Sequence, residues 1–344
     1  MKRILFAIFI LIGAFLVWQK LTVIKLRVAG QPSSTGLITL QLEQPFFASL
    51  QSMTNLPIEL EYKSLDELGI KDTYQLPMMK EGIFDLISLR FVQNIQNEIT
   101  IDGLDLTGLN LSDEKGRELS KAYSVVVDKN LQEKYHVKLL GLWAFGPQEL
   151  FCSKPIKKLS DLYGYKVRVA GESMTKFIAA LGAIPVILPF EDTREALKNQ
   201  IIDCAITSAT SANSAGWLNY IKYYVPFTFN NGVNGYAITL YKWNQLNEKQ
   251  RLIFQEAFKQ HTENIWKYSQ LLRKETQACM LGQDSCKQKK YEIVQVDMSD
   301  EDIGITKKMA KNISLNNWVE RCIQEYPHCS DDWIKLAGPY AGID

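Results

Sequence analysis

Four blocks between residues 154 and 210 decide the fold. They are KPI at 154–156, DLYGYKVRV at 161–169, LGAIPVILPFEDTREAL at 181–197 and IIDCAITSAT at 201–210. Apolar runs at 166–169, 185–188 and 204–207 predict three strands, and residues 192–199 predict a helix between two of them. Strands that alternate with helices indicate a mostly parallel sheet, so this segment is predicted to be α/β.

The same alternation occurs earlier in the chain and predicts a second lobe. Strands are expected at 23–28, 58–62, 84–89 and 137–142, and a helical pattern begins near Leu37. A chain of 344 residues, 46% of them hydrophobic, is long enough to bury the core of two lobes. We predict a first lobe from residues 23–145 and 235–270. The second would comprise residues 146–234 and 271–344, including a carboxy-terminal tail.

A long helix is predicted from residue 247 to about residue 277. Apolar and aromatic side chains recur there every three or four residues on one face. At 1.5 Å per residue the helix would reach roughly 45 Å, which is longer than one small lobe. It is either an ordinary packing helix or a scaffold that spans both lobes.

The composition argues against several classes of function. A net charge of +1 gives no general attraction to nucleic acid or to an anionic membrane. The three histidines lie near no second ligand or nucleophile motif, so histidine-based catalysis and a zinc site are not expected. The sequence has no phosphate-binding loop and no dinucleotide-binding glycine motif. We expect no cofactor, no metal and no nucleic-acid partner.

The amino terminus carries an export pattern. Two basic residues, Lys2 and Arg3, precede an apolar run at 4–18. No small-residue cleavage site and no lipobox cysteine follow, so residues 1–22 are either a signal peptide or an uncleaved membrane anchor, and we favour the anchor slightly. Either interpretation puts the folded body in the periplasm or, if tethered, on the extracytoplasmic face of the inner membrane.

Six cysteines agree with an oxidising compartment. Cys279 and Cys286, and likewise Cys322 and Cys329, are close in sequence and predict two local disulfides. A metal site built from these four thiols is the alternative, although the spacing is wider than in typical zinc sites. Cys152 and Cys204 are expected to be buried small hydrophobic residues rather than a third bridge.

The blocks quoted first, in their order and spacing, resemble the DctP-type substrate-binding proteins of tripartite ATP-independent periplasmic (TRAP) transporters. The likeness covers about 70 residues closely and extends more loosely from Leu26 to about Leu272; the tail with four cysteines has no counterpart. The resemblance implies a two-lobe periplasmic binding protein fold that closes on a small organic acid. It also implies delivery to a TRAP-type permease that couples uptake to an ion gradient.

The resemblance selects Arg168, Phe190 and Thr207 as ligand-binding residues. Arg168 alternates with two apolar neighbours on its strand, and a guanidinium can hold a carboxylate through two parallel hydrogen bonds. In the family, the matching arginine receives the ligand carboxylate and the matching aromatic packs against the ligand. Thr207 stands where many relatives have an asparagine. The alternatives are a structural ion pair for Arg168, core packing for Phe190 and a solvated turn for Thr207.

Other positions depart from the family pattern. Gln148 stands where relatives often have a second arginine, and Cys204 replaces a glycine. Arg90 lies at a position that faces the cleft in relatives, so it could supply the missing positive charge. An exposed surface arginine is equally compatible with the pattern. Gln31 and Asp72 are further cleft candidates by the same alignment.

The sequence therefore predicts an exported solute-binding protein without catalytic residues. A membrane-tethered ligand sensor, anchored through residues 4–18, is the first alternative. An enzyme using carboxylates such as Glu149, Glu191 or Asp192 is the weakest, because no activated nucleophile accompanies them.

Overall fold

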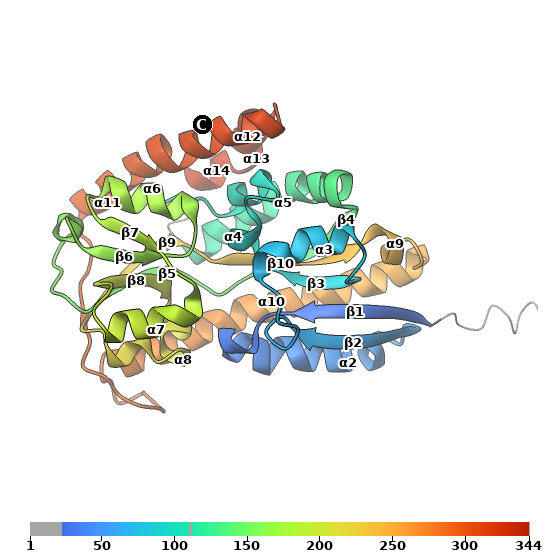
Figure 1. The fold of residues 1–344 in the computed structure, drawn as a ribbon, viewed down its shortest axis with the longest axis horizontal. Coiled ribbons are helices and arrows are strands. Elements are labelled where there is room, and N and C mark those ends of the chain that lie inside the picture. Colours follow the sequence, from blue (N-terminus) through green and yellow to red (C-terminus); the bar gives the residue numbers. More distant parts are fainter. Residues whose placement is uncertain (1–22, 110–111, 344) are drawn as a thin grey trace, which may run out of the picture.

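The computed structural model describes residues 23–109 and 112–343, which form two lobes, each built on its own β-sheet (Figure 1). The predicted targeting segment at 1–22 lies outside the described residues. Within the described residues, no helix is both long enough and apolar enough to span a membrane.

The first lobe contains a five-stranded sheet in the order β2-β1-β3-β10-β4. Its strands are β1 (Ile24–Gly30), β2 (Ile58–Ser64), β3 (Leu86–Leu89), β4 (Val137–Ala144) and β10 (Val233–Thr239). Strand β1 is parallel to β2 and β3, whereas β10 is antiparallel to β3 and β4. Alternate residues of β1 are buried on one face because Leu26 and Val28 pack against Phe47 and Phe258 in one apolar cluster.

The second lobe contains a six-stranded sheet in the order β11-β9-β5-β8-β6-β7. Its strands are β5 (Gln148–Cys152), β6 (Lys166–Val169), β7 (Ile184–Ile187), β8 (Cys204–Ser208), β9 (Tyr223–Asn230) and β11 (Val294–Gln295). Strand β6 is parallel to β7 and β8, and β5 is antiparallel to β8 and β9. Val167 and Val169 enter the core on one face of β6, which turns Arg168 to the other face.

Helices cover both sheets. They are α2 (Gln44–Thr54), α3 (Gln75–Lys80), α4 (Phe91–Asn94), α5 (Asp113–Tyr135), α6 (Glu172–Ala180), α7 (Phe190–Lys198), α8 (Ala209–Ser214), α9 (Leu240–Trp243), α10 (Glu248–Met280), α11 (Asp300–Met309), α12 (Asn316–Glu325), α13 (Cys329–Leu336) and α14 (Gly338–Ala341). Short helical turns occupy Ser33–Thr35, Thr39–Glu43, Asp72–Tyr74, Ile99–Leu104, Leu159–Leu162, Trp217–Asn219 and Ala310–Leu315.

The predicted α/β fold class is confirmed, and each of the seven predicted strands is present. Strands β5, β9, β10 and β11 were not predicted. Both faces of β10 are buried, so its sequence lacks the polar-apolar alternation that identifies a half-buried strand. The antiparallel strands β5 and β10 each follow a passage of the chain from one lobe to the other.

Helix α10 spans both lobes, as the scaffold interpretation predicts. Its 33 residues correspond to about 50 Å. It begins at Asn247, whose side chain accepts a hydrogen bond from the Gln250 amide while Gln250 bonds back to the Asn247 amide. Its first half packs on β4 and α2, and its second half reaches α8 and pairs Arg273 with Glu149 of β5 (Figure 1).

Both predicted local disulfides form, Cys279–Cys286 and Cys322–Cys329. The expectation for Cys152 and Cys204 is wrong, because they form a third disulfide. They face each other directly in the antiparallel pair β5–β8, with 4.1 Å between their Cα atoms. The 52-residue separation concealed this pairing, since β5 itself was not predicted.

The carboxy-terminal tail contacts both lobes. Near the start of α11, Asp302 accepts a hydrogen bond from the Leu159 amide of the second lobe. Further on, the indole nitrogens of Trp318 and Trp333 donate to the Ile99 and Gly103 carbonyls of the first lobe. Both indoles are fully buried, so the tail is part of the folded core.

Candidate functional site

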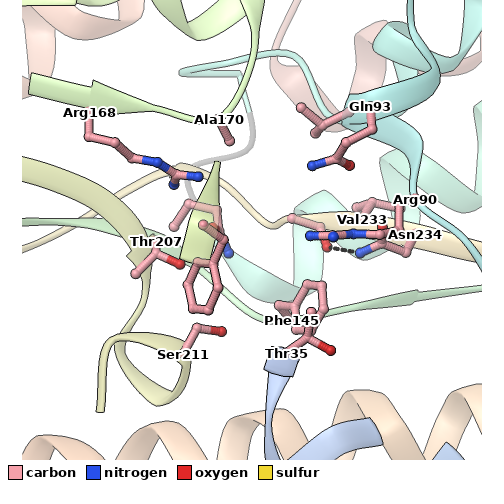
Figure 2. A pocket seen from close by; sticks show the side chains of 14 residues that line it. Thr35, Arg90, Gln93, Phe145, Arg168, Ala170, Thr207, Ser211, Val233 and Asn234 are labelled. Carbon is pink, nitrogen blue, oxygen red and sulfur yellow. Dashed lines mark hydrogen bonds between the residues drawn. The ribbon is translucent and has the colours of Figure 1, made fainter. Parts of the chain in front are cut away.

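A pocket lies between the two lobes, at the strand ends and at the two places where the chain passes from one sheet to the other. It encloses about 550 Å³ of space, part of it open to solvent. Figure 2 shows Arg168 and Arg90 approaching from opposite sides. The lining residues are Thr35, Arg90, Val92, Gln93, Phe145, Gln148, Arg168, Ala170, Phe190, Thr207, Ser211, Gly232, Val233 and Asn234.

Arg168 is buried in the wall formed by the second lobe, with 5% of its surface exposed. Its Nε donates to the Leu188 carbonyl at 3.0 Å and its Nη1 to the Ile206 carbonyl at 3.1 Å. The Trp217 ring lies 5.7 Å from its Cζ, a cation–π arrangement. These neighbours fix the plane of the guanidinium and leave its remaining N–H groups for a ligand (Figure 2).

No carboxylate in the described part of the chain forms an ion pair with Arg168. Burial and then the charge of Arg90 lower the pKa of Arg168 to about 10, an effect that Glu191 partly opposes. The side chain therefore remains a cation at neutral pH. A buried cation without an acidic partner is an electrostatic site for an anion.

Arg90 enters from the first lobe, between β3 and α4, and its environment differs. Its Nη1 forms an ion pair with Asp72. Burial raises the pKa of Asp72, while the nearby charge of Arg90 acts in the opposite direction. The backbone amide of Arg90 donates to Gln75 Oε1, which fixes the start of α4.

The polar lining of the second lobe is uncharged apart from Arg168. Thr207 is the penultimate residue of β8, and Ser211 lies in the first turn of α8, where its amide and hydroxyl both bond to the Ser208 hydroxyl. The Nε2 of Gln148 donates to the Gly146 carbonyl at 2.8 Å. Phe190 begins α7, and its ring lies 5.1 Å from the Trp217 ring.

Five of the seven ligand-binding residues predicted from sequence line this pocket: Gln148, Arg168, Phe190 and Thr207 from the second lobe, and Arg90 from the first. Asp72 does not line it and lies beside Arg90 as its partner. Gln31 does not line it either. Its side chain is fully buried, and its Nε2 donates to the backbone and hydroxyl oxygens of Ser88.

The sequence interpretation missed several lining residues, including Gln93, Phe145 and Asn234. Phe145 lies between β4 and β5, and Asn234 is the second residue of β10. The lobe boundaries predicted at 145/146 and 234/235 lie next to both residues, but neither side chain was proposed to bind the ligand. An Asn-Gly pair at 231–232 was a usable turn signal. Trp217, which supports Arg168 and Phe190 from behind, has no sequence signature that separates it from an ordinary core tryptophan.

Within residues 23–109 and 112–343, no group of three or more His, Cys, Asp or Glu side chains is placed to hold a metal ion. The arrangement can bind an anion. Glu149, one of the carboxylates considered for catalysis, is fully buried and occupied by the Tyr224 hydroxyl and Arg273.

Two lobes joined by crossing strands and a long helix, with an unpaired buried arginine in the pocket between them, define a two-lobe solute-binding protein. Residues 37–311 match the family model of the bacterial extracellular solute-binding proteins, family 7 (DctP), and the chain belongs to that family. The resemblance read from the sequence is confirmed. Members of the family are solute-binding proteins rather than enzymes.

Individual relatives are more distant. A Haemophilus influenzae protein without an assigned function is 25% identical over 135 residues. That match covers 39% of this chain and 41% of the relative, so the chain spans about two fifths of the length of this curated relative.

Solved structures share the fold over nearly their whole length. DctP7 of Bordetella pertussis, an extracytoplasmic solute receptor binding pyroglutamic acid, has a TM-score of 0.76 at 15% identity, covering 90% of this chain and 99% of that one. A TRAP periplasmic solute-binding protein of Rhodoferax ferrireducens with bound malonate has a TM-score of 0.74 at 16% identity, covering 92% and 98%.

Proposed function

We propose that this protein captures a small organic carboxylate outside the cytoplasm and delivers it to a TRAP-type membrane permease. The observation that carries the proposal is Arg168, a buried cation directed into the pocket between the lobes, which has no acidic partner among the residues that the structure describes (Figure 2). The solved relatives with bound pyroglutamic acid and malonate support a carboxylate as the ligand.

The mechanism follows from how the pocket is shared between the lobes. The ligand carboxylate binds the free N–H groups of Arg168, while Phe190 and Thr207 contact the rest of the molecule from the same lobe. Arg90, Gln93 and neighbouring first-lobe groups reach the ligand only when the lobes are close together. Ligand binding favours closure through these additional contacts, and the permease recognises the closed form.

The location and the partner are parts of the same proposal. The family is extracellular, and three disulfides suit an oxidising space. We propose the periplasm, or the outer face of the inner membrane if residues 4–18 are retained as a tether. A tethered sensor would use the same pocket and differ in its partner. Amino-terminal sequencing of the mature protein tests the tether, because a start after residue 18 rules it out.

Calorimetry on purified protein tests the binding function. Pyroglutamate, malonate and a panel of small organic acids are titrated into the wild type and into Arg168→Gln. We expect the variant to bind at least about 100-fold more weakly, because two hydrogen bonds to a charged group contribute roughly 1.5–3 kcal/mol each.

Arg117→Gln is the matched control, since Arg117 pairs with Glu263 and lies over Trp266, away from the pocket. Binding that is unchanged in Arg168→Gln, or absent for every acid tested with the wild type, would contradict the proposed function.

A further inference from the structure

Two arginines face the pocket, but only one of them lacks a counter-charge. Arg168 has no acidic partner in the described part of the chain, whereas Arg90 forms an ion pair with Asp72. The Asp72 side chain is 20% exposed and that of Arg90 13%, so this pair is shielded from water. The buried charges at the site therefore amount to one uncompensated positive charge.

Glu191 is the other acidic group that acts on this region. It follows Phe190 in the first turn of α7, and its charge acts on both Arg168 and Asp72. It is exposed to solvent and forms no ion pair with either arginine in the described part of the chain. The negative charge of Glu191 near the pocket repels a second anion rather than binding it.

The other lining side chains are neutral. Polar groups are supplied by Thr35, Gln93, Gln148, Thr207, Ser211 and Asn234. Hydroxyl and amide groups of this kind can bond to a ligand's hydroxyls, carbonyls or N–H groups, but they do not neutralise a carboxylate. Gln148, in particular, is an amide facing the cavity next to the β5–β8 pair.

We propose that the pocket selects organic acids with a single negative charge and a neutral, hydroxyl- or amide-bearing body, and that Asp72 excludes a second carboxylate. This inference rests on the proposed function, since it assumes that Arg168 binds the first carboxylate. Asp72 occupies the Nη1 of Arg90, whereas the Arg90 Nε has no hydrogen-bond partner among the described residues. A second carboxylate placed at Arg90 therefore lies beside the Asp72 carboxylate and is repelled by it, or displaces it and leaves Asp72 half-buried without its partner. A second carboxylate placed elsewhere in the pocket loses its water and contacts only neutral groups. Both arrangements are unfavourable for a buried anion.

The first experiment compares acids that differ in charge but little in shape. Purified protein is screened by thermal shift with D-gluconate and D-glucarate, butyrate and succinate, and propionate and malonate. Every acid that stabilises the protein is then measured by calorimetry beside the other member of its pair. We expect the monocarboxylate to bind at least about tenfold more tightly, a difference that one unpaired buried charge readily produces.

The second experiment tests Asp72 itself. In Asp72→Asn the Arg90 charge is free, so the dicarboxylate is expected to gain about tenfold or more in affinity while the monocarboxylate changes by less than about threefold. The double variant Asp72→Asn/Arg90→Gln removes both charges and is expected to restore the preference for the monocarboxylate.

Asp128→Asn is the matched control. Asp128 pairs with Lys138 at the α5–β4 contact, remote from the pocket, and its side chain is 23% exposed, close to the 20% of Asp72. We expect its affinity ratio to equal that of the wild type, and thermal unfolding of each variant reports whether it is folded.

The outcomes separate the two proposals. A dicarboxylate that binds the wild type as tightly as its monocarboxylate partner overturns the charge selection and leaves the binding function intact. An affinity ratio in Asp72→Asn equal to that of the wild type overturns the role of Asp72. If no acid of either charge binds the wild type, the proposed function fails and the selection fails with it.

Discussion

The indole of Trp217 is predicted to control ligand affinity although it does not line the pocket. It is fully buried behind the site, 5.7 Å from the Arg168 Cζ and 5.1 Å from the Phe190 ring, measured between ring centroids. A desolvated cation–π contact contributes about 1–2 kcal/mol. In Trp217→Leu the guanidinium loses this contact and the aromatic plane that orients it, so we expect carboxylate affinity to fall by about 5- to 30-fold.

The assay is calorimetry with pyroglutamate or the tightest-binding acid, together with chemical denaturation. Trp217→Phe keeps an aromatic face and should weaken binding less than Trp217→Leu. Trp318→Leu is the control, because Trp318 is an equally buried tryptophan that packs against Tyr123 and Trp333, neither of which lines the pocket. If Trp217→Leu and Trp318→Leu lose similar stability and both keep wild-type affinity, Trp217 is only a core residue and the reasoning is refuted.

Three further predictions concern stability. Replacing Cys152 and Cys204 together by serine should lower the free energy of unfolding by about 4 kcal/mol, because this disulfide closes a 52-residue loop. Removing either of the other two disulfides, which close seven-residue loops, should cost about 2.4 kcal/mol. Denaturation without reductant measures both losses, and equal losses would refute the loop argument. Burial lowers the pKa of His261 to about 3. Between pH 6.5 and 3 the unfolded chain therefore binds a proton that the folded protein does not bind. The free energy of unfolding should fall by about 1.4 kcal/mol per pH unit as the pH drops through that window. His261→Phe lacks this titration, so the difference in unfolding free energy between the wild type and the variant should change by about 1.4 kcal/mol per pH unit in that window. Parallel plots of stability against pH would contradict this prediction. Trp333→Ala deletes a fully buried indole that donates to the Gly103 carbonyl and should cost about 3–5 kcal/mol, whereas a loss under about 1 kcal/mol would show that the tail is not part of the core.

Sequence reasoning worked where a local pattern coincides with the tertiary role. Arg168 sits between two valines on a short strand, so the alternation of a strand already placed it opposite the core. Phe190 begins α7 just after β7, and Thr207 is the penultimate residue of β8, so both lie near the carboxyl edge of the same sheet, where ligand sites of α/β folds occur. The local pattern made these positions candidates, and the resemblance to the DctP-type proteins selected them over an ion pair, core packing and a solvated turn.

The rest depends on contacts between distant segments. Gln31 directly follows β1, as a cleft residue would. Its side chain is turned inward, because its amide donates hydrogen bonds to Ser88 of the neighbouring strand. Asp72 is half-buried because Arg90, 18 residues away, pairs with it. The Cys152–Cys204 bridge likewise exists only through the antiparallel pairing of β5 and β8. No local periodicity carries information on such pairs.

The passages between the lobes are also walls of the pocket, and this links binding to the proposed closure. Phe145 and Gly232 lie in the segments between the sheets, Asn234 is the second residue of β10, and all three line the cavity. Gly232 has a positive φ of 64°, and a Cβ at this position would lie 2.6 Å from the Gln148 Nε2. The positive φ favours glycine at this turn, and any side chain here would push the Gln148 amide aside within the pocket. In the proposed closure these segments would serve as the hinge, so a ligand that contacts Gln148 and Asn234 would touch the parts of the chain that change shape. Helix α10 and the tail contact both lobes and would limit the directions of that movement.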